Sequence, residues 1–377
     1  MFRRNAIGPY KVLNAAAFDD NTEMLSMIDS TADVFKTENF ILQNGSILPV
    51  LEVAYETYGR AANAKENTIL LLHGYTSSPH AGGGGDSNPG WWEDLIGPGR
   101  AIDTNRYFVV TPNMLGSAYG TTGPRSINPE TGKPYGPDFP DITTRDMIEV
   151  HKLLLDYFGV CELAAVVGYS YGGYLTFQWG VTYPTRMRAL VPVATGITGR
   201  GDESTIRELE KQFESAAGWN GGHYYDAGDG VADALIEFRS NVLQNYGVDV
   251  ELRDRGLDEA AVRSQLHSQA AKWAAEFDAN SLIALRRCAT NYDAKPDAAE
   301  IAAPLLYILS TTDTLFGPEL GEPTVAHIRK VAGSDATYHE LESPYGHRAP
   351  SVDSAKWADA LERFLNAHAN LKAEAAE

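Results

Sequence analysis

A serine stands between two glycines in the segment Gly168-Tyr169-Ser170-Tyr171-Gly172, and this spacing is the clearest chemical signal in the sequence. An apolar run over 163–167 predicts a buried strand before it, and residues 171–179 predict a helix directly after it. Strand, Gly-x-Ser-x-Gly and helix form the context of a nucleophile elbow, a strained turn that holds a serine oxygen at the carboxyl end of a sheet. We therefore predict that Ser170 is a nucleophile, and not a residue of an ordinary glycine-rich turn.

A serine hydroxyl is a poor nucleophile until a base takes its proton, and histidine is the side chain suited to that task near neutral pH. Of the nine histidines, His347 is the one expected on a loop after the last predicted strand, 337–341. His73 follows another predicted strand, and we expect it to be structural. The sequence thus favours His347 as the general base.

The acid that orients the base is expected after the preceding strand of the sheet. Asp313 follows the apolar run 305–309, where its carboxylate could accept a hydrogen bond from the imidazole. The alternative is a turn or helix-capping aspartate, which is common at strand ends. The order Ser170, Asp313, His347 is that of the α/β-hydrolase triad, and three roles in the right order favour the catalytic interpretation.

The negative oxygen of a tetrahedral intermediate needs two converging backbone N–H donors. The amide of Tyr171, directly after the nucleophile, is the first candidate. The amide of Tyr75, in the turn after the predicted strand 68–72, is the second. These two amides form the predicted oxyanion hole.

The elements around these residues predict an α/β-hydrolase fold, with a mostly parallel sheet and helices on both faces. Asn44-Gly45 between apolar runs predicts a hairpin, and continuous apolar runs such as 68–72 and 107–111 predict strands buried on both faces. Residues 195–297 are polar and helix-rich, with predicted helices over 202–217, 230–244 and 258–287. We interpret 195–297 as a helical lid inserted into a core made of 1–194 and 298–377, with residues 1–33 as a possible arm and the tail 367–377 frayed.

Composition limits the partners of the chain. The net charge of −19 argues against binding to nucleic acid or to an anionic membrane surface. No apolar run approaches the ~20 residues that span a bilayer, and two cysteines, Cys161 and Cys288, are expected to be buried and reduced. The expected location is the cytoplasm. No metal site is expected, because the proximity of His80 and Asp86 in the sequence is interpreted as a coincidence within a loop. The glycine run 82–85 is not a phosphate-binding loop, because no Gly-Lys-Ser/Thr sequence ends it.

Several long motifs resemble the homoserine O-acetyltransferase family of α/β hydrolases. They occupy residues 88–103, 113–117, 123–129, 135–140 and 277–281. The resemblance implies a Ser-His-Asp triad, an acyl-enzyme, no cofactor and a helical lid through which a homodimer forms. The family contains acetyl-CoA-dependent acyltransferases and also carboxylic ester hydrolases on the same scaffold.

Two departures from the family pattern guide the functional prediction. The acetyltransferases place an aspartate for the ammonium group of homoserine directly after the catalytic histidine, where this chain has Arg348. They carry an arginine for the carboxylate in the first lid helix, where an alignment by eye gives Lys211. The alternative interpretation is that Arg348 faces solvent and has no functional consequence.

From these departures we predict a serine carboxylesterase acting on small acetyl esters. The alternative is an O-acetyltransferase that uses acetyl-CoA and homoserine or a related alcohol, and a non-catalytic binding protein is a third possibility. The first two share every catalytic residue, so the triad does not distinguish water from an alcohol as the acyl acceptor. Acyl length and the alcohol are likewise not determined by the sequence.

Overall fold

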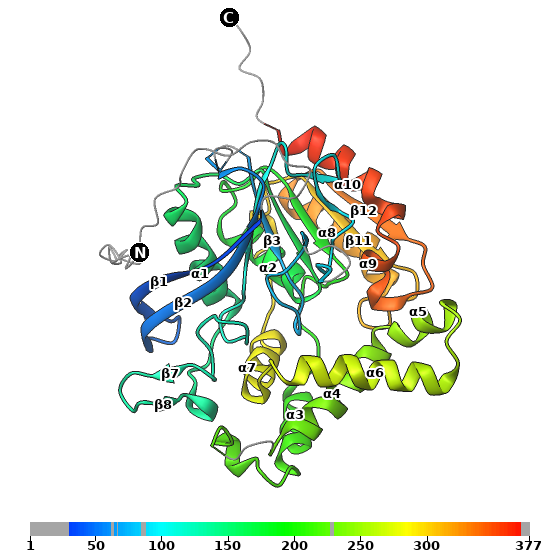
Figure 1. Ribbon diagram of the computed structural model, residues 1–377. Coiled ribbons are helices and arrows are strands. Elements are labelled where there is room, and N and C mark those ends of the chain that lie inside the picture. The colour runs from blue at the N-terminus through cyan, green and yellow to red at the C-terminus, as the bar shows by residue number, and fades with distance from the viewer. Residues whose placement is uncertain (1–29, 62–63, 66, 84–87, 227–229, 371–377) are drawn as a thin grey trace, which may run out of the picture.

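Eight strands form one sheet in the order β1-β2-β6-β3-β9-β10-β11-β12 (Figure 1). The computed structural model describes residues 30–61, 64–65, 67–83, 88–226 and 230–370. Residues 1–29 of the predicted arm, Asp86 and the end of the tail lie outside the described residues. The strands of the sheet are β1 Ser30–Ile41, β2 Ile47–Tyr58, β3 Thr68–Leu72, β6 Phe108–Pro112, β9 Ala165–Tyr169, β10 Leu190–Val193, β11 Leu305–Ser310 and β12 Ala336–Leu341.

The predicted hairpin at one edge of the sheet is confirmed. β1 and β2 pair antiparallel, and the turn between them holds Gly45 at φ +86°. The side chain of Asn44 accepts a 2.8 Å hydrogen bond from the amide of Ser46, which closes the turn. The predicted end of the arm, residue 33, is wrong, because Ser30 already pairs with Tyr58 and belongs to β1.

The remaining six strands are parallel to one another, and their apolar runs serve two cores. Alternate residues of β3 point to opposite faces, so that Leu70 and Leu72 join one core while Ile69 and Leu71 join the other. Val166 and Val167 of β9 divide in the same way. Burial on both faces explains why these strands are continuously apolar in the sequence.

Helices cover both faces of the sheet, as predicted. The first core contains residues of α1, α2 and α8, and the second contains residues of α10. Helix α1 begins after Thr143, which accepts a hydrogen bond from the amide of Asp146 and completes a capping box with it. The helix bounds are α1 Thr144–Tyr157, α2 Tyr171–Thr182, α8 Gly321–Ala332, α9 Ala349–Val352 and α10 Ala355–His368.

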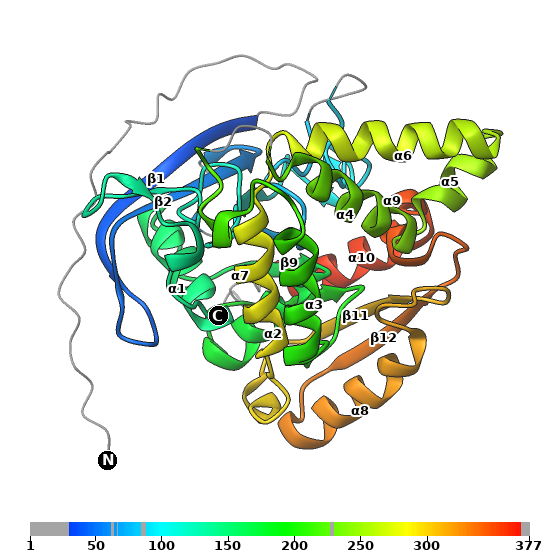
Figure 2. The same ribbon diagram turned by 90° about the horizontal axis from the view of Figure 1, so that it is seen from below.

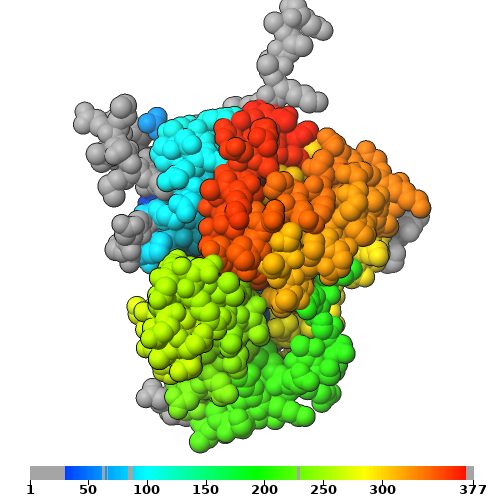
Figure 3. Space-filling model, turned by 90° about the vertical axis from the view of Figure 1, so that its right-hand side faces the viewer, coloured from blue at the N-terminus to red at the C-terminus, as the bar shows by residue number. Residues whose placement is uncertain are grey.

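The described residues of 195–297 form five α-helices, which lie below the sheet in Figure 1 and cross in front of it in Figure 2. In Figure 3 this insertion forms a lobe of its own, green to yellow-green, beneath the orange and red C-terminal part. Its helices are α3 Glu203–Glu214, α4 Ala232–Asn245, α5 Val248–Asp254, α6 Glu259–Ala274 and α7 Ala279–Thr290.

The helix predicted over 258–287 is wrong as a single element. Asp278 ends the continuity, because its carboxylate caps α7 by accepting from the amide of Ser281. The hydroxyl of Tyr224 donates to the same carboxylate, so a distant segment fixes the break. Sequence periodicity also missed α5 and four two-residue strands, β4 Ile96–Gly97, β5 Ile102–Asp103, β7 Ile127–Asn128 and β8 Lys133–Pro134.

The two cysteines differ in their surroundings. Cys288 is buried in α7, as expected, but Cys161 is exposed before β9 begins at Ala165. The expectation of a buried Cys161 is therefore wrong, because the strand starts later than the apolar pattern suggested. In the described part of the chain, no helix is long and apolar enough to cross a bilayer.

His73 and His151 are completely buried. His73 follows β3, where its Nδ1 lies 2.9 Å from the carbonyl oxygen of Gly74 and its Nε2 accepts from the amide of Met114 at 3.3 Å. His151 of α1 has no hydrogen-bond partner for either ring nitrogen among the described residues. Burial lowers the pKa of His73 to about 4 and that of His151 to about 3.

These pKa values predict acid destabilisation before the carboxylates titrate. Between the unfolded pKa near 6.5 and the lowered native values, the unfolded chain binds protons that the native chain does not. The free energy of unfolding should thus fall by about 2 kcal/mol per histidine between pH 6.5 and pH 4.5. His151→Leu should remove about half of that slope in urea titrations at a series of pH values, whereas His267→Leu, on the exposed face of α6, should leave it unchanged. An unchanged slope in His151→Leu would contradict this account.

Candidate active site

Ser170, His347 and Asp313 lie in hydrogen-bond contact at the carboxyl ends of the parallel strands. His347 Nε2 is 2.8 Å from Ser170 Oγ, and His347 Nδ1 is 2.7 Å from Asp313 Oδ2. All three residues are buried. Ser170 follows β9, Asp313 follows β11, and His347 follows β12, so the structure brings together the three residues that the sequence proposed as a triad.

The turn at Ser170 has the geometry of a nucleophile elbow. Ser170 adopts φ 57° and ψ −115°, which is strained for a residue with a side chain. A Cβ at Gly168 would lie 2.1 Å from the carbonyl oxygen of Gly172, and a Cβ at Gly172 would lie 2.0 Å from that of Leu72. The two glycines are thus required because strand, helix and the end of β3 approach too closely for any side chain.

The hydrogen bonds of Asp313 determine the tautomer of the imidazole. Its Oδ1 accepts from the amides of Leu315 at 2.8 Å and Phe316 at 3.2 Å, which fixes the carboxylate. Its Oδ2 is then directed to His347 Nδ1, which carries the proton. Nε2 is left with a lone pair for the proton of Ser170 Oγ, as a general base requires.

Aromatic rings enclose the imidazole. The ring centroid of His347 lies 4.8 Å from that of Tyr246, 5.3 Å from that of Tyr169 and 5.8 Å from that of Phe316. The hydroxyl of Tyr169 also donates to the carbonyl oxygen of His347 at 2.6 Å, which ties the histidine loop to the elbow strand. This packing limits access of water to the base and holds the ring in one orientation.

The turn that carries Tyr75 lies against the nucleophile. A Cβ at Gly74 would be 3.5 Å from the Cβ of Ser170, and the rings of Tyr75 and Tyr171 stack at 6.1 Å. Within the described residues, neither of these tyrosine amides donates a hydrogen bond to another protein group. The oxyanion hole of Tyr75 and Tyr171 stays a prediction with which this geometry is compatible.

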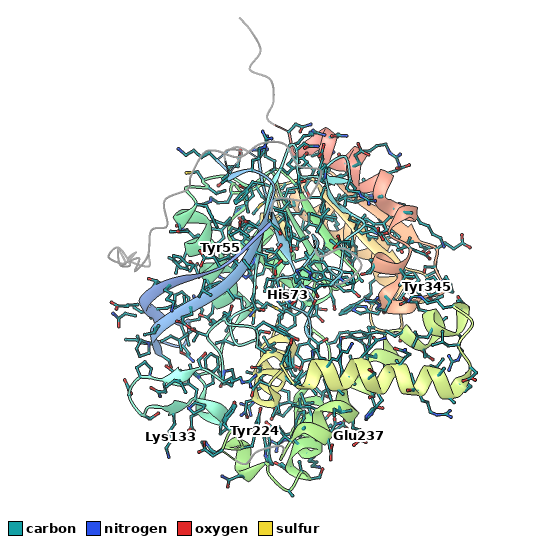
Figure 4. All side chains as sticks on the ribbon, in the orientation of Figure 1. Tyr55, His73, Lys133, Tyr224, Glu237 and Tyr345 are labelled. Atoms are coloured by element: carbon teal, nitrogen blue, oxygen red, sulfur yellow. The ribbon has the colours of Figure 1, made fainter. Side chains whose placement is uncertain are left out.

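His73 has the structural place that the sequence predicted for it. Its ring joins the turn at Gly74 to the loop at Met114, and it has no described contact with Ser170. Figure 4 labels it near the centre of the molecule, between the sheet and the helices of the insertion.

The two predicted substrate-binding residues lie in different places. Arg348 directly follows the general base, and its amide donates to the carbonyl oxygen of Tyr246 at 3.1 Å. Lys211 is exposed on α3, and no contact among the described residues connects it with the triad. The structure therefore gives no support to Lys211 as a substrate-binding residue.

Arg239 is a candidate substrate-binding residue that sequence reasoning missed. It projects from α4, donates to the hydroxyl of Thr76 and lies over the ring of Trp273 at 5.1 Å. Its Nε is sealed from solvent without a hydrogen-bond partner, and no described carboxylate forms an ion pair with it. Thr76 neighbours the predicted oxyanion donor Tyr75, so a guanidinium without a described carboxylate partner lies beside the predicted oxyanion turn. Only tertiary contact reveals this, because the sequence places Arg239 within an ordinary polar helix.

Comparisons with known proteins agree with this architecture. Residues 67–349 match the family model described as the alpha/beta hydrolase fold. A homoserine O-acetyltransferase of Moorella thermoacetica is 39% identical over 349 residues, covering 86% of this chain and 92% of that protein. A crystallised homoserine O-acetyltransferase of Bacillus anthracis has a TM-score of 0.77 and 26% identity, covering 92% of this chain and all of that one. A crystallised esterase has a TM-score of 0.78 and 30% identity, covering 89% of this chain and all of that one.

The fold and the relatives define an enzyme of the hydrolase and acyltransferase type. The chain belongs to the homoserine O-acetyltransferase-like family of α/β hydrolases, as its motifs indicated.

The prediction of a carboxylesterase is wrong. The relatives that are 34–39% identical over most of the chain are homoserine O-acetyltransferases, which favours the alternative, acyl transfer to an alcohol. The error came from giving two charged positions more weight than the rest of the chain. Hydrolysis and transfer proceed through the same acyl-enzyme, so substitutions at the acceptor end do not by themselves exclude transfer.

Proposed function

We propose that this chain is an O-acyltransferase that moves the acetyl group of acetyl-CoA to the hydroxyl of homoserine or a related small alcohol. The observation that carries the proposal is the hydrogen-bonded chain Ser170–His347–Asp313 in a protein 39% identical to a homoserine O-acetyltransferase. A positioned serine and base make and break an acyl-enzyme, the intermediate that such a transfer requires.

In the first half-reaction, Ser170 Oγ attacks the thioester carbonyl while His347 Nε2 takes its proton. The amides of Tyr75 and Tyr171 donate to the oxyanion, and Asp313 stabilises the imidazolium. The carbon–sulfur bond then breaks, and the proton of the imidazolium passes to the thiolate of CoA.

In the second half-reaction, the acceptor hydroxyl gives its proton to His347 and attacks the acetyl group on Ser170. The bond to Ser170 Oγ breaks, and the imidazolium returns the proton to this oxygen. The net result is one acetyl ester and one free thiol, with the enzyme unchanged. The guanidinium of Arg239 is the group we assign to a carboxylate of the acceptor, since it is unpaired and reaches the oxyanion turn through Thr76.

We further propose that 195–297 acts as a lid over the site. Three contacts between the lid and the site support this. The hydroxyl of Tyr75 donates to the carbonyl oxygen of Leu282 at 2.5 Å, and that of Tyr171 donates to that of Leu285 at 3.2 Å. The indole of Trp273 donates to the carbonyl oxygen of Thr76 at 2.9 Å. A lid that touches both predicted oxyanion residues would exclude water from the acyl-enzyme, which favours an alcohol as acceptor. A homodimer through this lid and a cytoplasmic location stay predictions.

The test of this function is transfer itself. Acetyl-CoA is offered with small hydroxy acids and amino hydroxy acids, homoserine among them, while thiol release and the acetyl ester are both measured. We expect thiol release to require the alcohol and to equal the ester formed. Thiol release at the same rate without any alcohol, and with no acetyl ester, would overturn the proposal.

The role assigned to Arg239 predicts a selective defect. Arg239→Lys replaces a forked donor by a point charge, so the KM for a carboxylate-bearing acceptor should rise by about tenfold or more. Acetylation of Ser170 by p-nitrophenyl acetate, which has no carboxylate, should change little. Arg207→Lys, on the exposed face of α3, is the matched control and should leave both measurements unchanged. Equal losses in both half-reactions would show that Arg239 acts on the fold and not on the acceptor.

A further inference from the structure

The peptide unit between Gly74 and Tyr75 offers one of the two predicted oxyanion N–H groups, and it is held at two points. At one end, the carbonyl oxygen of Gly74 accepts from the amide of Ser77 at 3.1 Å and lies 2.9 Å from His73 Nδ1. A planar peptide with one fixed atom can still rotate about that atom. The direction of the N–H therefore depends on the second point, the Cα of Tyr75.

The side chain of Tyr75 fixes this second point to helix α7 of the insertion. Its hydroxyl donates to the carbonyl oxygen of Leu282 at 2.5 Å. The guanidinium of Arg286, one turn further along α7, lies 5.2 Å from the centroid of the same ring. Burial raises the pKa of the Tyr75 hydroxyl, so it stays a protonated donor at neutral pH. The position of the Tyr75 backbone is thus coupled to the position of α7.

Tyr171, the other predicted oxyanion donor, has a similar side-chain bond but a different backbone support. Its hydroxyl donates to the carbonyl oxygen of Leu285 at 3.2 Å, and its ring stacks on that of Tyr75. Its amide belongs to the first residue of α2, where a Cβ at Gly172 would lie 2.0 Å from the carbonyl oxygen of Leu72. This close packing of the elbow holds the Tyr171 amide without help from the Tyr171 side chain.

We infer that Tyr75 is a positioning residue whose side chain, bound to α7, holds the Tyr75 amide in the oxyanion hole. The oxyanion hole is then complete only when α7 is in place. The insertion therefore does more than exclude water, because it anchors one of the two oxyanion donors. This inference rests on the proposed acyl-enzyme and its oxyanion hole, and it does not depend on the identity of the acyl acceptor.

The first measurement removes the hydroxyl and keeps the ring. The burst of p-nitrophenol from p-nitrophenyl acetate reports the acylation of Ser170 without any acceptor. In Tyr75→Phe the acylation rate constant should fall about tenfold at an unchanged half-saturating concentration, because a loosened donor loses part of the effect of a removed one. Tyr171→Phe should lose about threefold or less, since α2 still holds its amide. Tyr183→Phe removes a hydroxyl bonded to Glu149 at the far end of α2 and should leave acylation unchanged.

The second measurement uses 1,1,1-trifluoroacetone as a probe of the oxyanion hole. Ser170 Oγ adds to its carbonyl carbon, the serine proton passes to His347, and the former carbonyl oxygen becomes an anion in the hole. The inhibition constant should rise in Tyr75→Phe by the same factor by which acylation slows. A general loss of folding would instead lower the urea midpoint and the burst amplitude, which we expect to stay those of the wild type.

Two results would overturn the inference. Wild-type acylation in Tyr75→Phe, with faster hydrolysis of the acetyl-enzyme, would show that the bond to Leu282 only closes the lid. Equal losses of acylation in Tyr75→Phe and Tyr171→Phe would show that the loss follows from a loosened lid and not from the Tyr75 turn. Both results leave the proposed transfer standing. The proposed transfer fails instead if the wild-type enzyme acetylates no alcohol, and that result does not alter the acylation measurement.

Discussion

Replacing Ser170 by alanine should lower acetyl transfer by about four to six orders of magnitude, because the members of a triad act as a unit. The acyl-enzyme requires an oxygen at this position, and His347 Nε2 has no other described hydroxyl within hydrogen-bond distance. The substitution should not change stability through the backbone strain at φ 57°, because alanine carries the same Cβ as serine. Loss of activity should therefore occur in a folded protein.

Two measurements check this result. Thiol release from acetyl-CoA reports the chemistry, and the urea midpoint reports the fold. Ser215→Ala, on an exposed side chain after α3, is the matched control and should keep full activity. Retention of more than about a tenth of the wild-type rate in Ser170→Ala would remove Ser170 from the mechanism. A loss of less than about tenfold is smaller than the loss expected when a catalytic group is removed.

Asp313→Asn should lower the rate by about three to four orders of magnitude while preserving the size of the side chain. Asp313 Oδ1 is held by the amides of Leu315 and Phe316, so an asparagine would keep its carbonyl oxygen there. Its NH₂ group would then face His347 Nδ1 and force that nitrogen to become an acceptor. The ring proton would then be on Nε2. A protonated Nε2 has no lone pair with which to accept the proton of Ser170 Oγ.

The control for charge is Asp249→Asn on α5, where the carboxylate pairs with Arg253 away from the triad. It should leave the rate within about twofold of wild type, because no described contact joins this ion pair to the triad. A loss at Asp313 no larger than that at Asp249 would mean that Asp313 is a turn residue, the alternative considered from the sequence.

The fold was predictable because hydrophobic periodicity and turn chemistry are local. Asn44-Gly45 gave the hairpin, and the continuous runs at 68–72 and 305–310 gave the doubly buried strands. The predicted first and last residues of strands and helices were less accurate where contacts with distant residues determine them. β9 begins at Ala165, and the earlier Leu163 forms only an isolated bridge with Met187, which left Cys161 exposed.

The sequence by itself determined the strand–turn–helix around Ser170 and the order of Ser170, Asp313 and His347, because glycine spacing and chain order are properties of the chain. Only the tertiary structure decided which charged groups meet at the acceptor end. Arg239 lies 69 residues after Ser170 in the sequence, whereas the fold carries it to Thr76 beside the predicted oxyanion hole. Lys211, selected by counting along the chain, instead faces solvent. Helix packing sets which face of an inserted helix turns inward, and that packing depends on contacts with residues far away in the sequence.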